Sequence, residues 1–236
     1  MAKQRISRSR KRELQKPDEF ISFTGGILQA VSENRRRFIV GGAALIVVIL
    51  AVIGFRYHAA RTEENASRLL QAGLEKMEDI GPAENASDPL RVEVKRDLEM
   101  VVEKYPGKKA GKIARILLAD IAAETGEYES ALMLYERALK DFNNDPFYTT
   151  LILKGLAYAN EQSGNLDSAM AYMKSAKAGP DLGFEDEVLY HLGRLASEKG
   201  MHDEGAAYYR ELLESHPDSI YADLAEEEAA ALQPDL

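Results

Sequence analysis

The chain has 236 residues, 45% of them hydrophobic, with no cysteine and a formal net charge of −9. This composition excludes a disordered chain and a collagen-like fibre, and the lack of cysteine excludes disulfides, thiolate zinc sites and catalytic thiols. The charge is divided unevenly, because residues 1–37 carry ten Lys and Arg against four acids, whereas the remainder carries 20 basic and 35 acidic residues. A basic terminus on an acidic body predicts contact with an anionic surface at that end only.

An uncharged apolar segment follows the basic terminus. Residues 38–55 read FIVGGAALIVVILAVIGF, 18 residues without a charged side chain. As a helix this segment spans about 27 Å, close to the hydrocarbon thickness of a bilayer. It is longer than the apolar part of a cleaved signal peptide, and no good cleavage site follows it. We therefore predict a transmembrane signal anchor over residues 38–57, with Phe38, Phe55 and Tyr57 as aromatic anchors at the two interfaces.

The charges before this segment predict its orientation. Arg35, Arg36 and Arg37 directly precede it, so the positive-inside rule makes residues 1–37 a basic cytoplasmic arm. Within the arm, residues 18–33 have apolar side chains at helical spacing and could lie along the membrane surface, although a loosely ordered insertion signal is the alternative. We expect no nucleic-acid binding, because no nucleic-acid-binding motif or interleaved aromatic residues accompany the basic side chains.

Beyond residue 58 the sequence predicts only helices. Apolar residues recur at spacings of three and four, and Gly, Pro and Asn interrupt them about every 15–20 residues. Three segments align with one another, near residues 112–145, 150–181 and 186–217. Their central glycines, Gly126, Gly164 and Gly200, are 38 and 36 residues apart, which predicts a first helix, a left-handed glycine turn and a second helix in each segment.

The second helix of each segment carries a small residue and then a large one. The small residues are Ala131, Ala169 and Gly205, where two helices are expected to touch, and the large ones are Tyr135, Met173 and Tyr209. This pattern, together with Leu118–Ala119, Leu156–Ala157 and Leu192–Gly193 on the first helices, resembles the tetratricopeptide repeat. We predict helices at 59–80 and 90–105 that together form a degenerate repeat, and a capping helix at 219–232. The prediction is an all-α chain, with one N-terminal transmembrane helix and a tetratricopeptide-type α-solenoid of about nine helices over residues 58–236.

The anchor region carries a second resemblance. Glu33-Asn34-Arg35 before the span and Gly54-Phe55-Arg56-Tyr57 after it resemble the ancillary subunit family of the bacterial SecYEG translocon. This resemblance implies an inner-membrane protein with periplasmic repeats that assists protein export and associates with SecYEG and periplasmic chaperones. A tetratricopeptide adaptor for another envelope assembly, such as division or cell-wall synthesis, is the alternative. A cytoplasmic regulator with inward-facing repeats is a third hypothesis, which the charge asymmetry disfavours.

No pattern in the sequence predicts catalysis, a cofactor or a metal. His58, His191, His202 and His216 lack metal-ligand spacing, and no nucleophile motif occurs. We expect a non-catalytic protein that binds proteins or peptides in the concave groove formed by the first helices of the repeats.

The groove residues follow from the repeat register. They are predicted to be Asp120, Lys154, Tyr158, Glu161, Tyr190 and Arg194. The two tyrosines, flanked by Lys154 and Arg194, could hold a peptide with an acidic group. The alternative is that the tyrosines only fill gaps between neighbouring helices.

Overall fold

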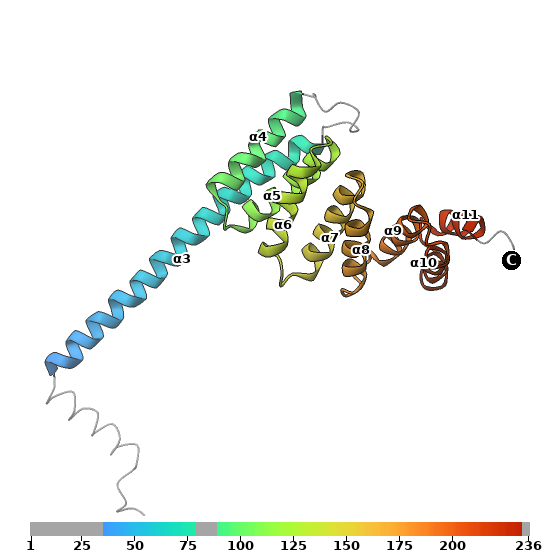
Figure 1. Cartoon of the computed structure of the whole chain (residues 1–236). Coiled ribbons are helices and arrows are strands. Elements are labelled where there is room, and N and C mark those ends of the chain that lie inside the picture. The colour runs from blue at the N-terminus through green and yellow to red at the C-terminus, as the bar shows by residue number, and fades with distance from the viewer. Residues whose placement is uncertain (1–34, 79–88, 233–236) are drawn as a thin grey trace, which may run out of the picture. The chain divides into compact units, whose positions relative to one another are not determined.

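A computed structural model describes residues 35–78 and 89–232 of the chain, and the predicted arm helix at 18–33 lies outside them. Every regular element among the described residues is an α-helix (Figure 1), as the sequence predicts. The helices are α3 (Arg35–Glu78), α4 (Pro89–Lys104), α5 (Lys109–Glu124), α6 (Tyr128–Asp141), α7 (Pro146–Gln162), α8 (Leu166–Lys177), α9 (Glu185–Glu198), α10 (His202–Ser215) and α11 (Ala222–Leu232).

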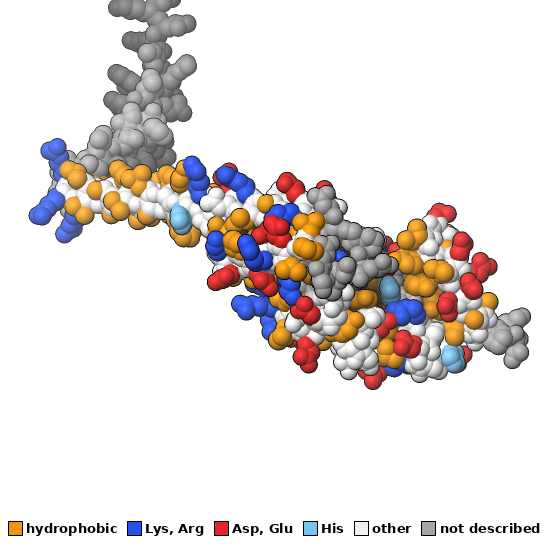
Figure 2. Space-filling model, turned by 90° about the horizontal axis from the view of Figure 1, so that it is seen from above, with side chains coloured by type: hydrophobic (Ala, Val, Ile, Leu, Met, Phe, Trp, Pro, Cys, Tyr) orange, Lys and Arg blue, Asp and Glu red, His pale blue; other side chains and the backbone are white. Residues whose placement is uncertain are grey.

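The chain divides into two compact units, residues 1–60 and 61–236, and α3 contributes to both. In the first unit, α3 contains an 18-residue window with a mean hydropathy of 2.9 and no buried residue. Figure 2 shows apolar side chains covering the visible face of this part of α3. The sequence suggested a separate helix at 59–80, but α3 continues without a break to Glu78. Between residues 56 and 78 there is no proline, and Gly73 is the one glycine.

Three helical hairpins form the centre of the second unit, namely α5–α6, α7–α8 and α9–α10 (Figure 1). Gly126, Gly164 and Gly200 join the two helices of each hairpin with φ angles of 78°, 78° and 74°. After each glycine, the next backbone N–H donates back into the first helix, as Glu127 does to the carbonyl of Ala122 over 2.8 Å. The left-handed turns predicted from the glycine spacing are therefore confirmed.

Large side chains on the second helices of the hairpins pack against small residues on the first helices. Tyr135, Met173 and Tyr209 are 3%, 4% and 0% exposed, as expected for the positions that fill the core. The Tyr209 ring lies against Gly193 so closely that a Cβ atom there would be 2.5 Å from Cε1 of the ring. Gly155 meets Tyr135 in the same way, at 2.4 Å. Glycine on the first helix thus creates the space that a ring on the second helix occupies.

The two ends of the array are closed by additional helices. On one side, Ala66 and Leu70 of α3 pack with Val94 and Leu98 of α4 and with residues of α5 in one buried cluster. On the other side, α11 packs through Ala225, and it begins three residues later than the predicted capping helix because residues 217–221 form turns. Within the described part of residues 61–236, α4–α11 and the end of α3 give the nine helices that were predicted.

Candidate protein-binding groove

A cavity of about 450 Å³ runs along the first helices of successive repeats. Residues of α3, α5, α7 and α9 line it, with single side chains from α6 and α8. The lining residues are Met77, Asp120, Ala123, Glu124, Leu151, Lys154, Gly155, Tyr158, Glu161, Glu187 and His191, with Tyr135 and Met173 from the second helices. We refer to this cavity as the concave groove.

Four of the six predicted groove residues line the concave groove, namely Asp120, Lys154, Tyr158 and Glu161. The Tyr158 side chain is 44% exposed, so its ring is available to a ligand. Tyr190 lies elsewhere: its ring stacks on that of Tyr221 at a centroid distance of 5.0 Å. Tyr190 therefore packs against the turn before α11.

The two predicted cationic anchors have carboxylate partners within the array. Lys154 Nζ lies 2.6 Å from Glu187 Oε2 and 4.4 Å from the centroid of the Phe184 ring. The Arg194 guanidinium makes a two-point contact with the Glu161 carboxylate, with Nη2 donating to Oε2 over 2.7 Å. An incoming acidic group would have to compete with these carboxylates, which the groove register alone does not indicate.

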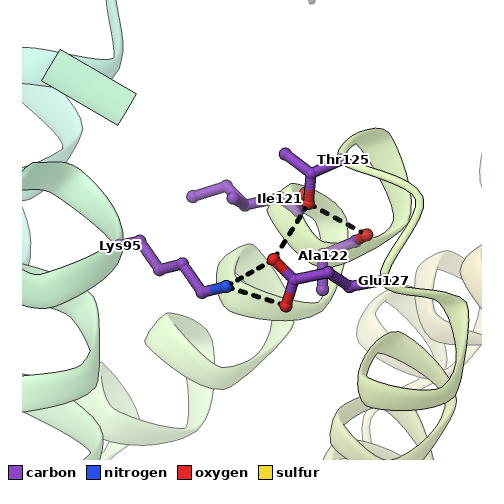
Figure 3. Close-up of polar contacts among 5 residues, drawn as sticks. All are labelled: Lys95, Ile121, Ala122, Thr125 and Glu127. Carbon is purple, nitrogen blue, oxygen red and sulfur yellow. Dashed lines mark hydrogen bonds and ion pairs between the residues drawn. The ribbon is translucent and has the colours of Figure 1, made fainter. Parts of the chain in front are cut away.

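Many ion pairs join neighbouring repeats. Six of them have separations of 32 to 34 residues: Arg91–Glu124, Lys95–Glu127, Lys154–Glu187, Glu161–Arg194, Asp167–Lys199 and Lys177–Glu211. Figure 3 shows one of them, in which Lys95 of α4 reaches Glu127 at the turn between α5 and α6. Such pairs connect neighbouring repeats, at separations a few residues shorter than the 36 and 38 residues between the central glycines. A search for opposite charges about one repeat apart would have found them.

Asp120 differs from the other acids of the concave groove. Glu124 pairs with Arg91 over 2.7 Å, and Glu161 and Glu187 have the partners described above. Asp120 accepts a hydrogen bond from the Tyr135 hydroxyl and has no cationic partner among the described residues. Burial raises the pKa of Asp120 above its ordinary value, with the neighbouring Glu124 adding to the effect, while the Tyr135 hydrogen bond opposes it. The groove therefore contains one carboxylate whose charge the array does not neutralise.

Two other titratable groups that line the groove, His191 and Tyr135, carry no positive charge at neutral pH. Burial and the nearby Arg194 lower the pKa of His191, so the imidazole is neutral at pH 7. Burial also raises the pKa of the Tyr135 hydroxyl, as does the charge of Asp120, so this hydroxyl remains a donor. Within the described residues, no group of three or more His, Asp or Glu side chains is arranged to hold a metal ion.

The predicted anchor and topology residues lie along the first part of α3. Arg35, Arg36 and Arg37 form its first turn. Phe38 is 50% exposed, and Phe55 and Tyr57, at the other end of the apolar segment, are 74% and 61% exposed. Basic and aromatic side chains thus flank a segment whose apolar side chains are all exposed.

Solved structures with a similar arrangement of helices include a tetratricopeptide repeat protein. A tetratricopeptide repeat protein from Parabacteroides merdae is 16% identical, with a TM-score of 0.59 over 73% of this chain and 61% of its own. PilF from Pseudomonas aeruginosa is 16% identical, with a TM-score of 0.56 over 73% of this chain and 69% of its own. MamA is 16% identical, with a TM-score of 0.53 over 72% of this chain and 93% of its own. At these identities the likeness is one of fold, and it confirms the predicted tetratricopeptide-type solenoid.

The sequence comparisons agree with the fold. No curated protein matches the sequence. The chain spans about three fifths of the Parabacteroides protein, since it covers 61% of that chain. Tetratricopeptide solenoids present extended concave surfaces for binding other proteins, and this chain has the architecture of such a non-enzymatic interaction scaffold. A family model described as a tetratricopeptide repeat-like domain matches residues 31–233, and the chain therefore belongs to that family.

Proposed function

We propose that this protein is a single-pass scaffold of the bacterial inner membrane, anchored by residues 38–57, whose repeats bind proteins in the periplasm. The observation that carries the anchor is the apolar part of α3, where Ile39, Leu45 and Ile53 are 60%, 61% and 57% exposed. Apolar side chains exposed over 18 successive residues are unfavourable in water and favourable in a lipid core. A core helix of a soluble protein would bury most of these side chains, whereas this window buries none.

The arginines at the start of α3 support a cytoplasmic N-terminus. Arg35, Arg36 and Arg37 belong to an arm of net charge +6, which is retained on the cytoplasmic side by the positive-inside rule. Under this topology the residues after position 57, including the concave groove, face the periplasm. The partners that we propose are SecYEG and periplasmic chaperones, on the strength of the likeness of the anchor-flanking residues to the ancillary translocon subunits.

The natural absence of cysteine makes the topology directly testable. We would make two single-cysteine variants, Ser7→Cys in the arm and Ser175→Cys at an exposed position of α8, and treat spheroplasts with a membrane-impermeant maleimide. The expected result is labelling of position 175 in intact spheroplasts and of position 7 only after permeabilisation. The reverse pattern would contradict the proposal and support a cytoplasmic repeat domain.

The partner is tested by affinity purification of the full-length protein in mild detergent, followed by mass spectrometry. The matched control replaces residues 38–55 by a Leu/Ala span of equal length, which keeps the repeats at a membrane. Capture of translocon subunits by the natural protein and their loss in the control would support an association through the anchor. Recovery of a different envelope complex with both proteins would contradict the Sec role and favour an adaptor for division or cell-wall synthesis.

A further inference from the structure

We infer that the concave groove binds partners through a Lys or Arg side chain that pairs with Asp120, beside an apolar side chain of the same partner. This inference rests on the proposed role of the groove in binding proteins and specifies the chemistry of the bound segment. It reverses the preference for acidic peptides that the sequence suggested.

The charges of the groove carry the argument. Three of its four carboxylates, Glu124, Glu161 and Glu187, each have a cationic partner within the array at 2.5–2.7 Å. The fourth, Asp120, has only the Tyr135 hydroxyl, which bonds to Oδ1 and leaves Oδ2 without a hydrogen bond among the described residues. A charge-assisted hydrogen bond to Oδ2 is therefore the strongest new polar contact that a ligand can make in this cavity.

An acidic ligand would not find a comparable partner. Lys154 is already bonded to Glu187, and its side chain is only 13% exposed. Arg194 holds Glu161 by two nitrogens, a geometry that a single incoming carboxylate could match only by displacing Glu161. Binding an acidic group would break an existing ion pair, whereas binding a cation at Asp120 breaks none.

The neutral lining of the groove fits the remainder of such a segment. Met77 and Leu151 provide apolar contacts, and the flexible side chain of Met77 accommodates different apolar side chains. The exposed ring of Tyr158 lines the same cavity and attracts cations to its face. A cavity of about 450 Å³ has room for a few side chains rather than a whole domain, so the bound element is a short peptide segment.

The test uses the full-length protein in detergent and a phage library of random dodecapeptides as the probe. Selections are run in parallel on the natural protein, on Asp120→Asn, and on Glu136→Gln as a control at an exposed position of α6 outside the groove. Asn keeps an oxygen that can accept the Tyr135 hydrogen bond, so the variant removes the charge and preserves the packing. Circular dichroism checks that all three proteins remain helical.

The expected result is enrichment of Lys and Arg in peptides selected by the natural protein and by Glu136→Gln, and loss of that enrichment with Asp120→Asn. The best peptide should bind Asp120→Asn roughly tenfold or more weakly, and replacing its Lys or Arg by norleucine should have little further effect on that variant. Enriched peptides that are acidic or uncharged, or a basic preference that persists in Asp120→Asn, would overturn the inference while leaving peptide binding intact. If none of the three proteins enriches any peptide, the groove is not a peptide site and the proposed function loses its binding surface as well.

Discussion

Replacing Gly193 by alanine should destabilise the repeat array, although alanine is the better helix former. The added Cβ would lie 2.5 to 2.7 Å from three atoms of the Tyr209 ring, and Tyr209 is 0% exposed and cannot move into solvent. Overpacking of this kind costs about 1–3 kcal/mol, against about 1 kcal/mol gained in helix propensity. Full burial of the ring favours the upper part of that range, so we expect a net loss of about 1–2 kcal/mol in the free energy of unfolding.

Gly73 provides the matched control within the same array. It also lies inside a helix, but a Cβ there would meet Leu98 Cδ2 at 3.5 Å, an ordinary van der Waals contact. Gly73→Ala should therefore stabilise the protein by up to about 1 kcal/mol. The assay is thermal unfolding of the full-length protein in detergent, followed by circular dichroism.

At about 2–4 °C per kcal/mol for a unit of this size, the midpoint should fall by roughly 2–8 °C for Gly193→Ala and rise by a few degrees for Gly73→Ala. Adding Tyr209→Leu to Gly193→Ala should cost less than Tyr209→Leu alone, because the clash is then absent. Equal increases in midpoint for both glycine variants would refute the reasoning that Gly193 is retained to accommodate the ring.

Three further predictions concern the turns and the groove. Gly164→Ala forces an L-residue to a φ of 78° and should cost about 1–2 kcal/mol in urea unfolding, whereas Gly107→Ala, in open space at an ordinary φ, should be nearly neutral. Asp120→Asn should raise the unfolding midpoint at pH 7. Because the pKa of Asp120 is raised from 3.8 on folding, the folded state retains a proton that the unfolded state has lost at pH values between the two pKa values, and the stability of the natural protein falls as the pH rises through that range. The midpoints of the two proteins should therefore converge below pH 3.8. An equal difference at pH 7 and below pH 3.8 would contradict this. Glu161→Gln should cost roughly 1 kcal/mol in thermal unfolding, and the loss should shrink in an Arg194→Met background; additive losses would mean that the pair is energetically uncoupled.

The order of the helices along this chain could be predicted because the local sequence signals and the packing agree. Gly126 and Gly164 are the residues that permit a left-handed turn, and their spacing alone indicates the hairpins. The small and large residues on the second helices indicate where helices touch, but the space for the rings of Tyr135 and Tyr209 comes from Gly155 and Gly193 on the first helices. The continuity of α3 was missed because an apolar segment and an amphipathic one were treated as separate elements, although no helix breaker stands between them.

The partners of charged side chains could not be predicted in the same way. The register places Lys154 and Glu161 on the face that lines the cavity, but a position on a face does not reveal whether its charge is already paired. Each partner lies 33 residues further along the chain, on the next repeat, at Glu187 and Arg194. The register also predicts Tyr190 in the groove, because it does not show where the chain turns before α11. That turn brings Tyr221 into contact with the Tyr190 ring.

The chemistry of the groove therefore depends on which charges remain after the repeats have paired with one another. Most charged side chains of the groove lining form ion pairs with neighbouring repeats and hold adjacent helices in place. These charges therefore stabilise the scaffold and do not indicate the ligand. Asp120 is the exception, because burial opposes its ionisation and no cation within the described array compensates it. An uncompensated and partly buried carboxylate reduces the stability of the free protein, and a bound cation would remove that cost. Asp120, the unpaired acid, is thus the feature of this groove that predicts the partner's chemistry. The more numerous paired charges do not.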